Sequence, residues 1–167
     1  MQFQETNHYP FPSDAVVRVF GDPDYFVAKY RGAGAKNIQV LEAINQGGKT
    51  QVSVSRQLHM DIAVPGFARK FVPDTITVTQ IDSWDQATRT GSLDIRFKGM
   101  PAVVKCEMSL ADENDQAVLS LSFSVTVNVP VLGDKLAKLL GEDLKKKFEK
   151  DSLNAHRMMA EFAPRYL

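Results

Sequence analysis

The sequence predicts an α+β fold in which a curved antiparallel sheet of about seven strands wraps around a long C-terminal helix. Two observations support this prediction. QAVLSLSFSVTVNV (116–129) alternates apolar and polar residues, as expected for a strand with one buried face and one solvated face. Residues 136–162 instead carry apolar residues at helical spacing. Such a helix would be about 40 Å long and a short strand only about 20 Å, so the helix must cross the whole width of the sheet.

The composition is that of an ordinary globular domain. At 167 residues, with 44% hydrophobic and 24% charged residues, the chain can bury a substantial core. No internal repeat, low-complexity tract or flexible linker interrupts it, so residues 1–167 are expected to form a single domain. The 20 Lys and Arg residues balance the 20 Asp and Glu residues. A chain without net charge has no overall field to attract nucleic acid, which we therefore do not expect as a partner.

Several features predict a cytoplasmic location. Cys106 is the single cysteine, so no internal disulfide forms and a reducing compartment is favoured. The N-terminal segment MQFQETNHYPFPSD lacks the basic start and apolar region of a secretory signal. No apolar run approaches the roughly 20 residues that span a bilayer. We expect no stable membrane insertion, while transient contact with a membrane surface stays open, as does the oligomeric state.

The N-terminal quarter predicts one strand and two short helices. Residues 2–9 are rich in strand formers. The helices that follow are separated by GDPD (21–24). Either Ser13 or Asp14 is expected to cap the first helix and Asp22 the second.

Residues 37–45 and 50–59 read as a hairpin around QGGK. A three-residue loop, Gly47-Gly48-Lys49, would pair Ile44 with Val52. We prefer this register because a slip of one residue would turn one strand's apolar side chains toward water. It gathers one set of apolar residues on one face: Ile38, Val40, Ile44, Val52, Val54 and Leu58.

After an irregular segment at residues 60–74, further strands are expected at residues 75–84, 90–97 and 102–112, before the strand at 116–129. The terminal helix follows, and its apolar stripe has one polar member, Asp151, among the residues Leu136, Leu140, Leu144, Phe148, Asp151, Ala155, Met159 and Phe162.

The ends and the middle of this helix also carry signals. Asp134 is expected to cap it, and Ala163-Pro164 to close it. Gly141 would allow either a bend or a close backbone approach.

The order strand, two short helices, six strands and long helix (β-α-α-β6-α), together with FPSDAVVRVFGDPDYF (11–26), resembles the helix-grip fold of the START-like, or SRPBCC, superfamily. That superfamily includes the birch pollen allergen and polyketide cyclases. PGFARKFVPDTITVTQIDSW (65–84) is similar to an uncharacterised bacterial branch, a domain of unknown function. The resemblance implies a cavity between sheet and helix that binds lipids, sterols, plant hormones, polyketides or quinones. A minority of members are enzymes. QGGK (46–49) matches the family's glycine-rich loop only in part, so we assign it no phosphate role.

The candidate walls of this cavity come from the inward-facing strand positions and from the terminal helix. A pocket of this kind is mostly apolar with few polar groups. The alternative is that the same residues simply pack as core, as protein interiors normally do. The candidates are Val54, Leu58, Val78, Leu93, Ile95, Val104, Met108, Leu121, Phe123, Leu144, Phe148 and Met159.

Arg56 is the most informative polar candidate for ligand binding. It shares its strand face with Val54 and Leu58, so it should point toward the apolar side. A buried guanidinium must pair, reach water or bind an anionic group. In the preferred hairpin register Glu42 lies diagonal to Arg56 and within reach of a salt bridge. The alternative is that Arg56 anchors the carboxylate or keto group of a lipophilic ligand.

Residues 60–72 are expected to form a rim or lid over the cavity. They combine Phe67 and Phe71 with Arg69 and Lys70. Long irregular segments in compact domains are often functional. The alternative is an ordinary connection whose phenylalanines fill the core.

The sequence carries no signal for a metal site or a cofactor. His8, His59 and His156 are far apart and show no ligand spacing. Cys106 shares its strand face with buried positions and is expected to be a small buried hydrophobe, not a nucleophile.

The preferred hypothesis is a non-enzymatic module that binds a small hydrophobic ligand for transport, sequestration or sensing. The alternative is a cyclase or dehydratase acting in the same cavity, with polar groups drawn from Tyr30, Glu42, Arg56, His59 and Asp61. A third hypothesis, an interaction protein of the co-chaperone type, would use the outer face of the sheet.

Two aspartates near Trp84 offer a different acid–base pair. Asp82 and Asp85 flank this tryptophan close to a turn. Turn aspartates are commoner than catalytic pairs, so we expect both to serve the turn.

Overall fold

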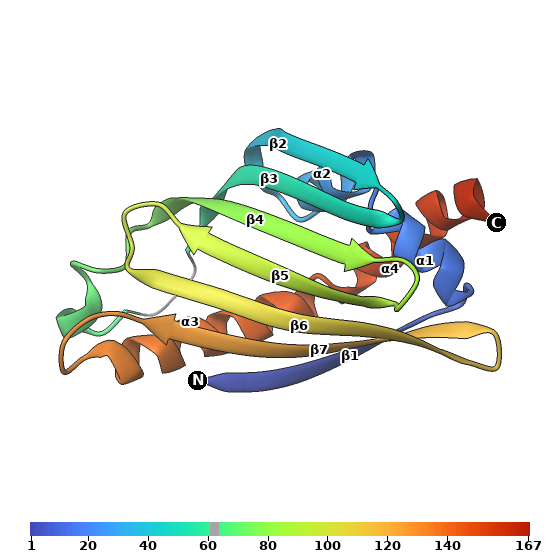
Figure 1. Ribbon diagram of the computed structural model, residues 1–167. Helices are drawn as coiled ribbons and strands as arrows, with labels where there is room; N and C mark the ends of the chain where they lie inside the picture. Colours follow the sequence, from blue (N-terminus) through green and yellow to red (C-terminus); the bar gives the residue numbers. More distant parts are fainter. Residues whose placement is uncertain (61–63) are drawn as a thin grey trace.

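The computed structural model describes residues 1–60 and 64–167 (Figure 1). Its strands form one seven-stranded antiparallel sheet in the order β1-β7-β6-β5-β4-β3-β2, which confirms the predicted fold class. The strands are β1 (Gln2–Tyr9), β2 (Lys36–Gln46), β3 (Lys49–His59), β4 (Thr75–Asp85), β5 (Thr90–Phe97), β6 (Ala102–Glu113) and β7 (Gln116–Val127). The helices are α1 (Ser13–Val19), α2 (Pro23–Gly32), α3 (Gly133–Lys150) and α4 (Ser152–Phe162), with short 3₁₀ turns at Gly66–Ala68 and Ala163–Tyr166.

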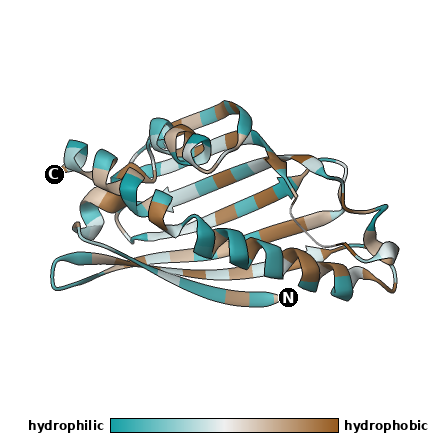
Figure 2. Ribbon diagram, turned by 180° about the vertical axis from the view of Figure 1, so that it is seen from behind, coloured by the Kyte–Doolittle hydropathy of each residue, from teal (hydrophilic) through white to brown (hydrophobic). Residues whose placement is uncertain are grey.

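The helices cover one face of the curved sheet, as Figure 2 shows from behind. There α3 and α4 run diagonally across the strands, and α2 lies beside them over the β2–β3 end. We call the helix-covered face the concave face. On β7 its inward residues Leu121, Phe123 and Val125 are buried, whereas the intervening Ser120 and Ser122 are exposed. The alternation in the sequence therefore predicted the orientation of this strand correctly.

Aromatic side chains join the helices to the sheet. Phe148 of α3 meets Phe123 of β7 edge to face, with ring centroids 5.5 Å apart. At the other end of the molecule the ring of Phe20, which follows α1, stacks on buried Trp84 of β4 at 5.3 Å. Such ring pairs stabilise a fold beyond their buried area by about 1 kcal/mol.

The predicted hairpin register is wrong. The loop has two residues, Gly47 and Gly48, whose φ angles are 60° and 77°. Gln46 therefore pairs with Lys49, and Ile44 lies opposite Gln51, not Val52. Two glycines provide the positive φ angles of a tight hairpin turn at no steric cost.

The apolar face proposed for β2 is lost with that register. β-Bulges shift the pairing between Lys36 and Gln39 and again between Val40 and Glu42. Val40 and Leu41 are 42% and 56% exposed, because β2 is the edge strand of the sheet. By contrast, Val52 and Val54 of β3 are buried as predicted. The prediction failed because it assumed that both strands of the hairpin lie under the helices.

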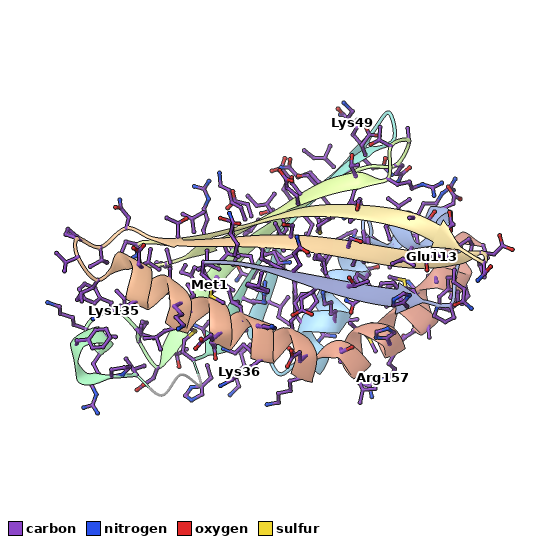
Figure 3. The ribbon with its side chains drawn as sticks, turned by 90° about the horizontal axis from the view of Figure 1, so that it is seen from below. Met1, Lys36, Lys49, Glu113, Lys135 and Arg157 are labelled. Carbon is purple, nitrogen blue, oxygen red and sulfur yellow. The ribbon has the colours of Figure 1, made fainter. Side chains whose placement is uncertain are left out.

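The C-terminal helical region is divided at Asp151 into α3 and α4. Asp151 is the polar residue that interrupts the apolar stripe, and its backbone (φ −88°, ψ 2°) leaves the helical conformation. Figure 3 shows both helices lying against the sheet from below. A Cβ atom at Gly141 would collide with the thioether of Met1, so the close approach at this glycine is made by a side chain and not by backbone.

The predicted caps are partly right. Asp22 accepts a hydrogen bond from the amide of Asp24 (2.9 Å) and caps α2. Asp134 lies inside the first turn of α3, whose N-cap is Leu132, so its predicted capping role is wrong. The carboxylate still lies at the positive end of the helix dipole.

Helix α1 uses neither Ser13 nor Asp14 as its cap. Its N-cap is Pro12, which makes no side-chain capping bond. The amide and hydroxyl of Ser13 donate to the carboxylate of Asp112 on β6, at 2.8 Å and 2.5 Å. The first turn of α1 is thus held by a residue far along the chain, which local sequence rules do not detect.

Candidate functional site

A line of polar side chains crosses the apolar concave face on β3 and β4. Arg56, Gln80 and Asp82 are 8%, 6% and 7% exposed. Strand pairing sets Val54 opposite Gln80 and Val52 opposite Asp82. Arg56 follows Val54 on the same face of β3 and therefore lies diagonal to Gln80. An Nη atom of Arg56 donates to Gln80 Oε1 (2.9 Å), and Gln80 Nε2 donates to Asp82 Oδ1 (3.0 Å). Gln80 therefore connects the guanidinium to the carboxyl group.

Helix α2 places three further side chains over this line. The guanidinium carbon of Arg56 lies 3.8 Å from the ring centroid of Tyr30, a close cation–π stack. Lys29 Nζ lies 5.9 Å from the ring centroid of Tyr25 and 5.7 Å from that of Tyr30. Together these side chains form what we call the polar cluster: Tyr25, Lys29, Tyr30, Arg56, Gln80 and Asp82.

Three buried polar atoms of the cluster have no hydrogen-bond partner within the described residues. They are the hydroxyls of Tyr25 and Tyr30 and Nη1 of Arg56. An unsatisfied buried donor costs about 1–3 kcal/mol, more for a charged group. Several such atoms gathered in one place make the polar cluster a candidate site for a bound ligand or bound water.

The ionisable groups of the cluster are shifted by their surroundings. Burial raises the pKa of the Asp82 carboxyl from its ordinary 3.8 to about 6, although Lys29, the bond from Gln80 and Arg56 all oppose this change. Burial lowers the pKa of the Lys29 ammonium, which Asp82 counteracts. Burial also raises the pKa of Tyr25 and Tyr30 well above 10, so both phenols keep their protons. The cluster therefore offers two phenol donors, two basic groups and one carboxyl that titrates near neutral pH.

The structure corrects two expectations about these residues. The Arg56–Glu42 ion pair is wrong, because the bulges in β2 set Glu42 opposite Ser53, with its side chain exposed. Asp82 is also not a turn residue, since it lies within β4 and faces inward. Asp85 does serve the turn and accepts from the amide of Ala87 (3.0 Å).

Sequence reasoning missed Tyr25, Lys29 and Gln80 as site residues, and it weighed Asp82 as an acid–base group but assigned it to a turn. The signal for the two on β4 was available, because they share strand parity with Val78 and Trp84. For Tyr25 and Lys29 it was weaker, since the side of α2 that would meet the sheet depends on tertiary packing.

The candidate wall residues are mostly interior. Together with the two rim phenylalanines, nine of them are buried, four are partly buried, and Phe67 is 43% exposed. The buried ones are Val54, Val78, Leu93, Ile95, Val104, Met108, Leu121, Phe123 and Met159, and the partly buried ones are Leu58, Phe71, Leu144 and Phe148. Whether they contact a ligand remains a prediction.

An apolar cavity lies where the first turns of α3 meet the end of the sheet. Its volume is about 10 Å³, room for about one water molecule. It is lined by Met60, Phe71, Val72, Met100, Val127, Leu136, Leu139 and Leu140. Phe71 thus connects the predicted rim to the interior. Asp61, named above for the enzyme hypothesis, lies outside the described residues, as does the rest of 61–63.

The remaining candidates for chemistry have ordinary surroundings. Cys106 is buried as predicted, and burial raises the pKa of its thiol to about 12, which is far from that of a nucleophile. Among residues 1–60 and 64–167, no three His, Cys, Asp or Glu side chains are arranged to hold a metal ion. Within the same ranges, no helix is both long and apolar enough to span a membrane.

Comparisons with solved structures support the fold. TTHA0849 from Thermus thermophilus is 12% identical, with 96% of this chain and 98% of that chain covered and a TM-score of 0.64. Ara h 8.0201 is 16% identical over the same shares, with a TM-score of 0.63. Zhui aromatase/cyclase from Streptomyces sp. R1128 is 18% identical, covering 99% and 94%, with a TM-score of 0.56. These likenesses confirm the START-like helix-grip fold.

A comparison with curated proteins finds no match. A family model does match, over residues 4–156, which is most of the chain. The chain therefore belongs to the family described as "Protein of unknown function (DUF2505)".

Proposed function

We propose that this protein binds a small lipophilic molecule, such as a lipid, a sterol-like compound, a polyketide or a quinone, between the concave face and helices α3 and α4. The observation that carries the proposal is a set of apolar side chains from the concave face, the rim and α3 that pack on the core and remain partly buried. Leu58, Phe71, Leu144 and Phe148 contact the core but stay only partly buried. Apolar side chains that line a ligand site are expected to behave in this way.

The family resemblance and the shared fold support the same ligand class. The START-like resemblance implies a lipophile-binding cavity, and one protein that shares the fold is named an aromatase/cyclase. Transport, sequestration and sensing all fit this binding activity. We assign the activity to a single domain of residues 1–167 in the cytoplasm, with no cofactor and no nucleic-acid partner.

Binding requires the interior to widen. A lipophile the size of a fatty acid needs far more room than the cavity of about 10 Å³ beside Phe71. We expect the rim segment that carries Phe67 and Phe71 to move outward, because Phe67 is exposed and Phe71 borders the cavity. Movement of a rim or lid on binding is common in proteins that enclose their ligands.

Native mass spectrometry of protein purified from its own host tests the proposal. The expected result is a non-covalent adduct whose mass identifies a lipophile, lost when the protein is denatured. A chain that carries no adduct, and that binds no member of a panel of lipids, sterols, polyketides and quinones in calorimetry, contradicts the proposal.

A pair of tryptophan variants locates the bound molecule. Leu144→Trp adds bulk to a partly buried position against the core and should weaken binding at least about tenfold by occupying ligand space. Leu153→Trp adds the same bulk to a residue that is 85% exposed, and should leave affinity unchanged. Equal effects of the two variants would move the site elsewhere.

The polar cluster favours a second candidate function, a cyclase or dehydratase acting on a molecule held in the same place. Asp82, with a pKa of about 6, can take up and return a proton near neutral pH. Arg56 and the two phenols can stabilise an enolate oxygen formed by that transfer. The test is turnover of a poly-β-ketone that the protein binds: Asp82→Asn should abolish turnover. Absence of turnover in the wild type leaves binding as the function.

A further inference from the structure

We propose that the polar cluster binds the anionic oxygen atoms of the ligand, so that the lipophile is a carboxylic acid with an apolar tail and not a neutral lipid. This inference rests on the proposed function and names the ligand class for it.

The hydrogen-bonding groups of the cluster point to an acceptor. Arg56 Nη1 and the hydroxyls of Tyr25 and Tyr30 are buried donors without partners in the described residues. Two acceptor oxygens nearby are already engaged, since Gln80 Oε1 receives from Arg56 and Asp82 Oδ1 receives from Gln80. A carboxylate supplies two oxygens with about four acceptor sites and no donor, which matches what the cluster lacks.

The net charge of the cluster also favours an anionic ligand. Lys29 and Arg56 contribute two cations and Asp82 one carboxyl group, which is protonated part of the time near neutral pH. Asp151 also attracts Lys29, but more weakly than Asp82 does. Buried charges require compensation, and a ligand carboxylate provides it through charge-assisted hydrogen bonds.

The surroundings of the cluster suit an apolar tail. In the sheet Arg56 lies opposite Val78, Gln80 opposite Ile95, and Asp82 opposite Leu93. Across the strands the same rows continue into the apolar residues of β6 and β7. A carboxylate held at Arg56 thus directs its tail along the concave face toward α3.

Calorimetric titration with three ligands that share one tail tests this inference. Dodecanoate, dodecanol and dodecylammonium have the same number of carbon atoms and differ in the terminal polar group, and each is used below its critical micelle concentration or solubility limit. The full chain should bind dodecanoate at least about tenfold more tightly than dodecanol, because a hydrogen bond to a charged group is worth about 1.5–3 kcal/mol. Dodecylammonium should bind most weakly, since it adds a third cation and no acceptor.

Two variants assign the head-group preference to the cluster. Arg56→Leu should reduce dodecanoate affinity at least about tenfold and leave dodecanol within about twofold of the wild type. Tyr30→Phe, which keeps the ring that stacks on Arg56 and removes only the hydroxyl, should reduce dodecanoate affinity by a smaller factor. The control Arg96→Leu removes an exposed arginine on the other face of the sheet and should change neither affinity.

The outcomes separate this inference from the proposed function. If dodecanol binds as tightly as dodecanoate, or if Arg56→Leu weakens both equally, the head-group assignment is overturned and lipophile binding stands. If none of the three ligands binds and the protein carries no native lipophile, both are overturned. Should Arg56→Leu fail to fold, the wild-type ranking and Tyr30→Phe still decide the question.

Discussion

Asp82 is a carboxyl group that the fold buries beside two cations, and burial has the largest effect on its ionisation. Lys29 and Arg56 each favour the charged form, yet the pKa of the carboxyl still rises. Desolvation therefore outweighs the attraction of both basic groups at this position. A protein that needed only stability would gain by an apolar residue here, which is consistent with a role for Asp82 in binding or proton transfer.

Replacing Asp82 should change how stability depends on pH. Because its pKa is raised from 3.8 to about 6 on folding, the folded state binds the proton more tightly than the unfolded state does. The contribution of Asp82 to the free energy of unfolding is then fully present below about pH 4 and is lost as pH rises through about 6. The loss is at most about 3 kcal/mol.

Urea unfolding followed by circular dichroism between about pH 4 and 8 measures this dependence. Asp82→Asn should lack the decline that Asp82 contributes between about pH 4 and 6, so the difference from the wild type should change sharply in that interval. The control variant Asp94→Asn, on the opposite face of the neighbouring strand, should keep the decline in stability between about pH 4 and 6. A constant difference between Asp82→Asn and the wild type at every pH would contradict the raised pKa.

For single residues, the sequence predicted the direction in which a side chain points better than the residue that it contacts. The inward direction of Arg56 followed from strand parity, and Arg56 is indeed buried. Its partner did not follow, because two bulges in β2 moved Glu42 away. Asp82 was assigned to a turn although it lies inside the strand predicted at residues 75–84, where its parity with Trp84 pointed inward.

Among the elements, α1 depends on a contact with β6. The carboxylate of Asp112 receives both the amide and the hydroxyl of Ser13, and these bonds lower its pKa. Arg89 lies close to the same group, with its guanidinium 3.9 Å from Asp112. This arrangement replaces the missing N-cap of the helix.

Asp112→Ala should lower the free energy of unfolding by about 1 kcal/mol, the usual worth of a helix cap. Because the folded-state pKa of Asp112 is lowered, its contribution is present above the ordinary carboxyl range and is lost as the carboxylate is protonated in acid. Urea unfolding at about pH 7 and about pH 3 measures both effects. Glu113→Ala, at the next position, serves as the control. An Asp112→Ala deficit that persists undiminished in acid would argue against a carboxylate cap.

Two glycines of α3 lie close to different kinds of atom: Gly133 faces backbone, and Gly141 faces a flexible side chain. A Cβ atom at Gly133 would collide with the carbonyl oxygen of Val127, which is a backbone atom of β7. A Cβ atom at Gly141 would meet only the mobile thioether of Met1.

Two matched alanine variants test that distinction. Gly133→Ala should destabilise the fold by about 1–3 kcal/mol through overpacking. Gly141→Ala should stabilise it by up to about 1 kcal/mol, since alanine favours a helix interior and Met1 can move. Thermal unfolding of both variants measures the effects, and the same sign for both would refute this account of the α3 contacts.

The whole molecule is a curved sheet with helices packed over one of its faces. The strict alternation of β7 and the apolar spacing of the C-terminal region predicted this arrangement, because both patterns report which face is buried. They did not predict the break at Asp151 or the exposure of Val40 and Leu41. Those features depend on how far the helical cover extends, which is a property of tertiary packing and not of local pattern.

Ligand binding to the folded state alone should raise the stability of the whole chain. At about one hundred times its dissociation constant, dodecanoate should increase the free energy of unfolding by about 2.7 kcal/mol. Urea titrations with dodecanoate and with dodecanol at equal concentration measure the increase, which should be larger for the carboxylate. A carboxylate that binds in calorimetry but leaves stability unchanged would have to bind the unfolded chain equally well, contrary to a site assembled by folding.

The stack of Phe20 on Trp84 gives the protein a built-in optical reporter. Trp84 is the single tryptophan, lies 3% exposed, and shares its strand and inner face with Gln80 and Asp82. Its fluorescence therefore comes from one known site close to the polar cluster. A shift in emission wavelength or lifetime when an amphiphile is added, with no label attached, would report a rearrangement within the interior in real time.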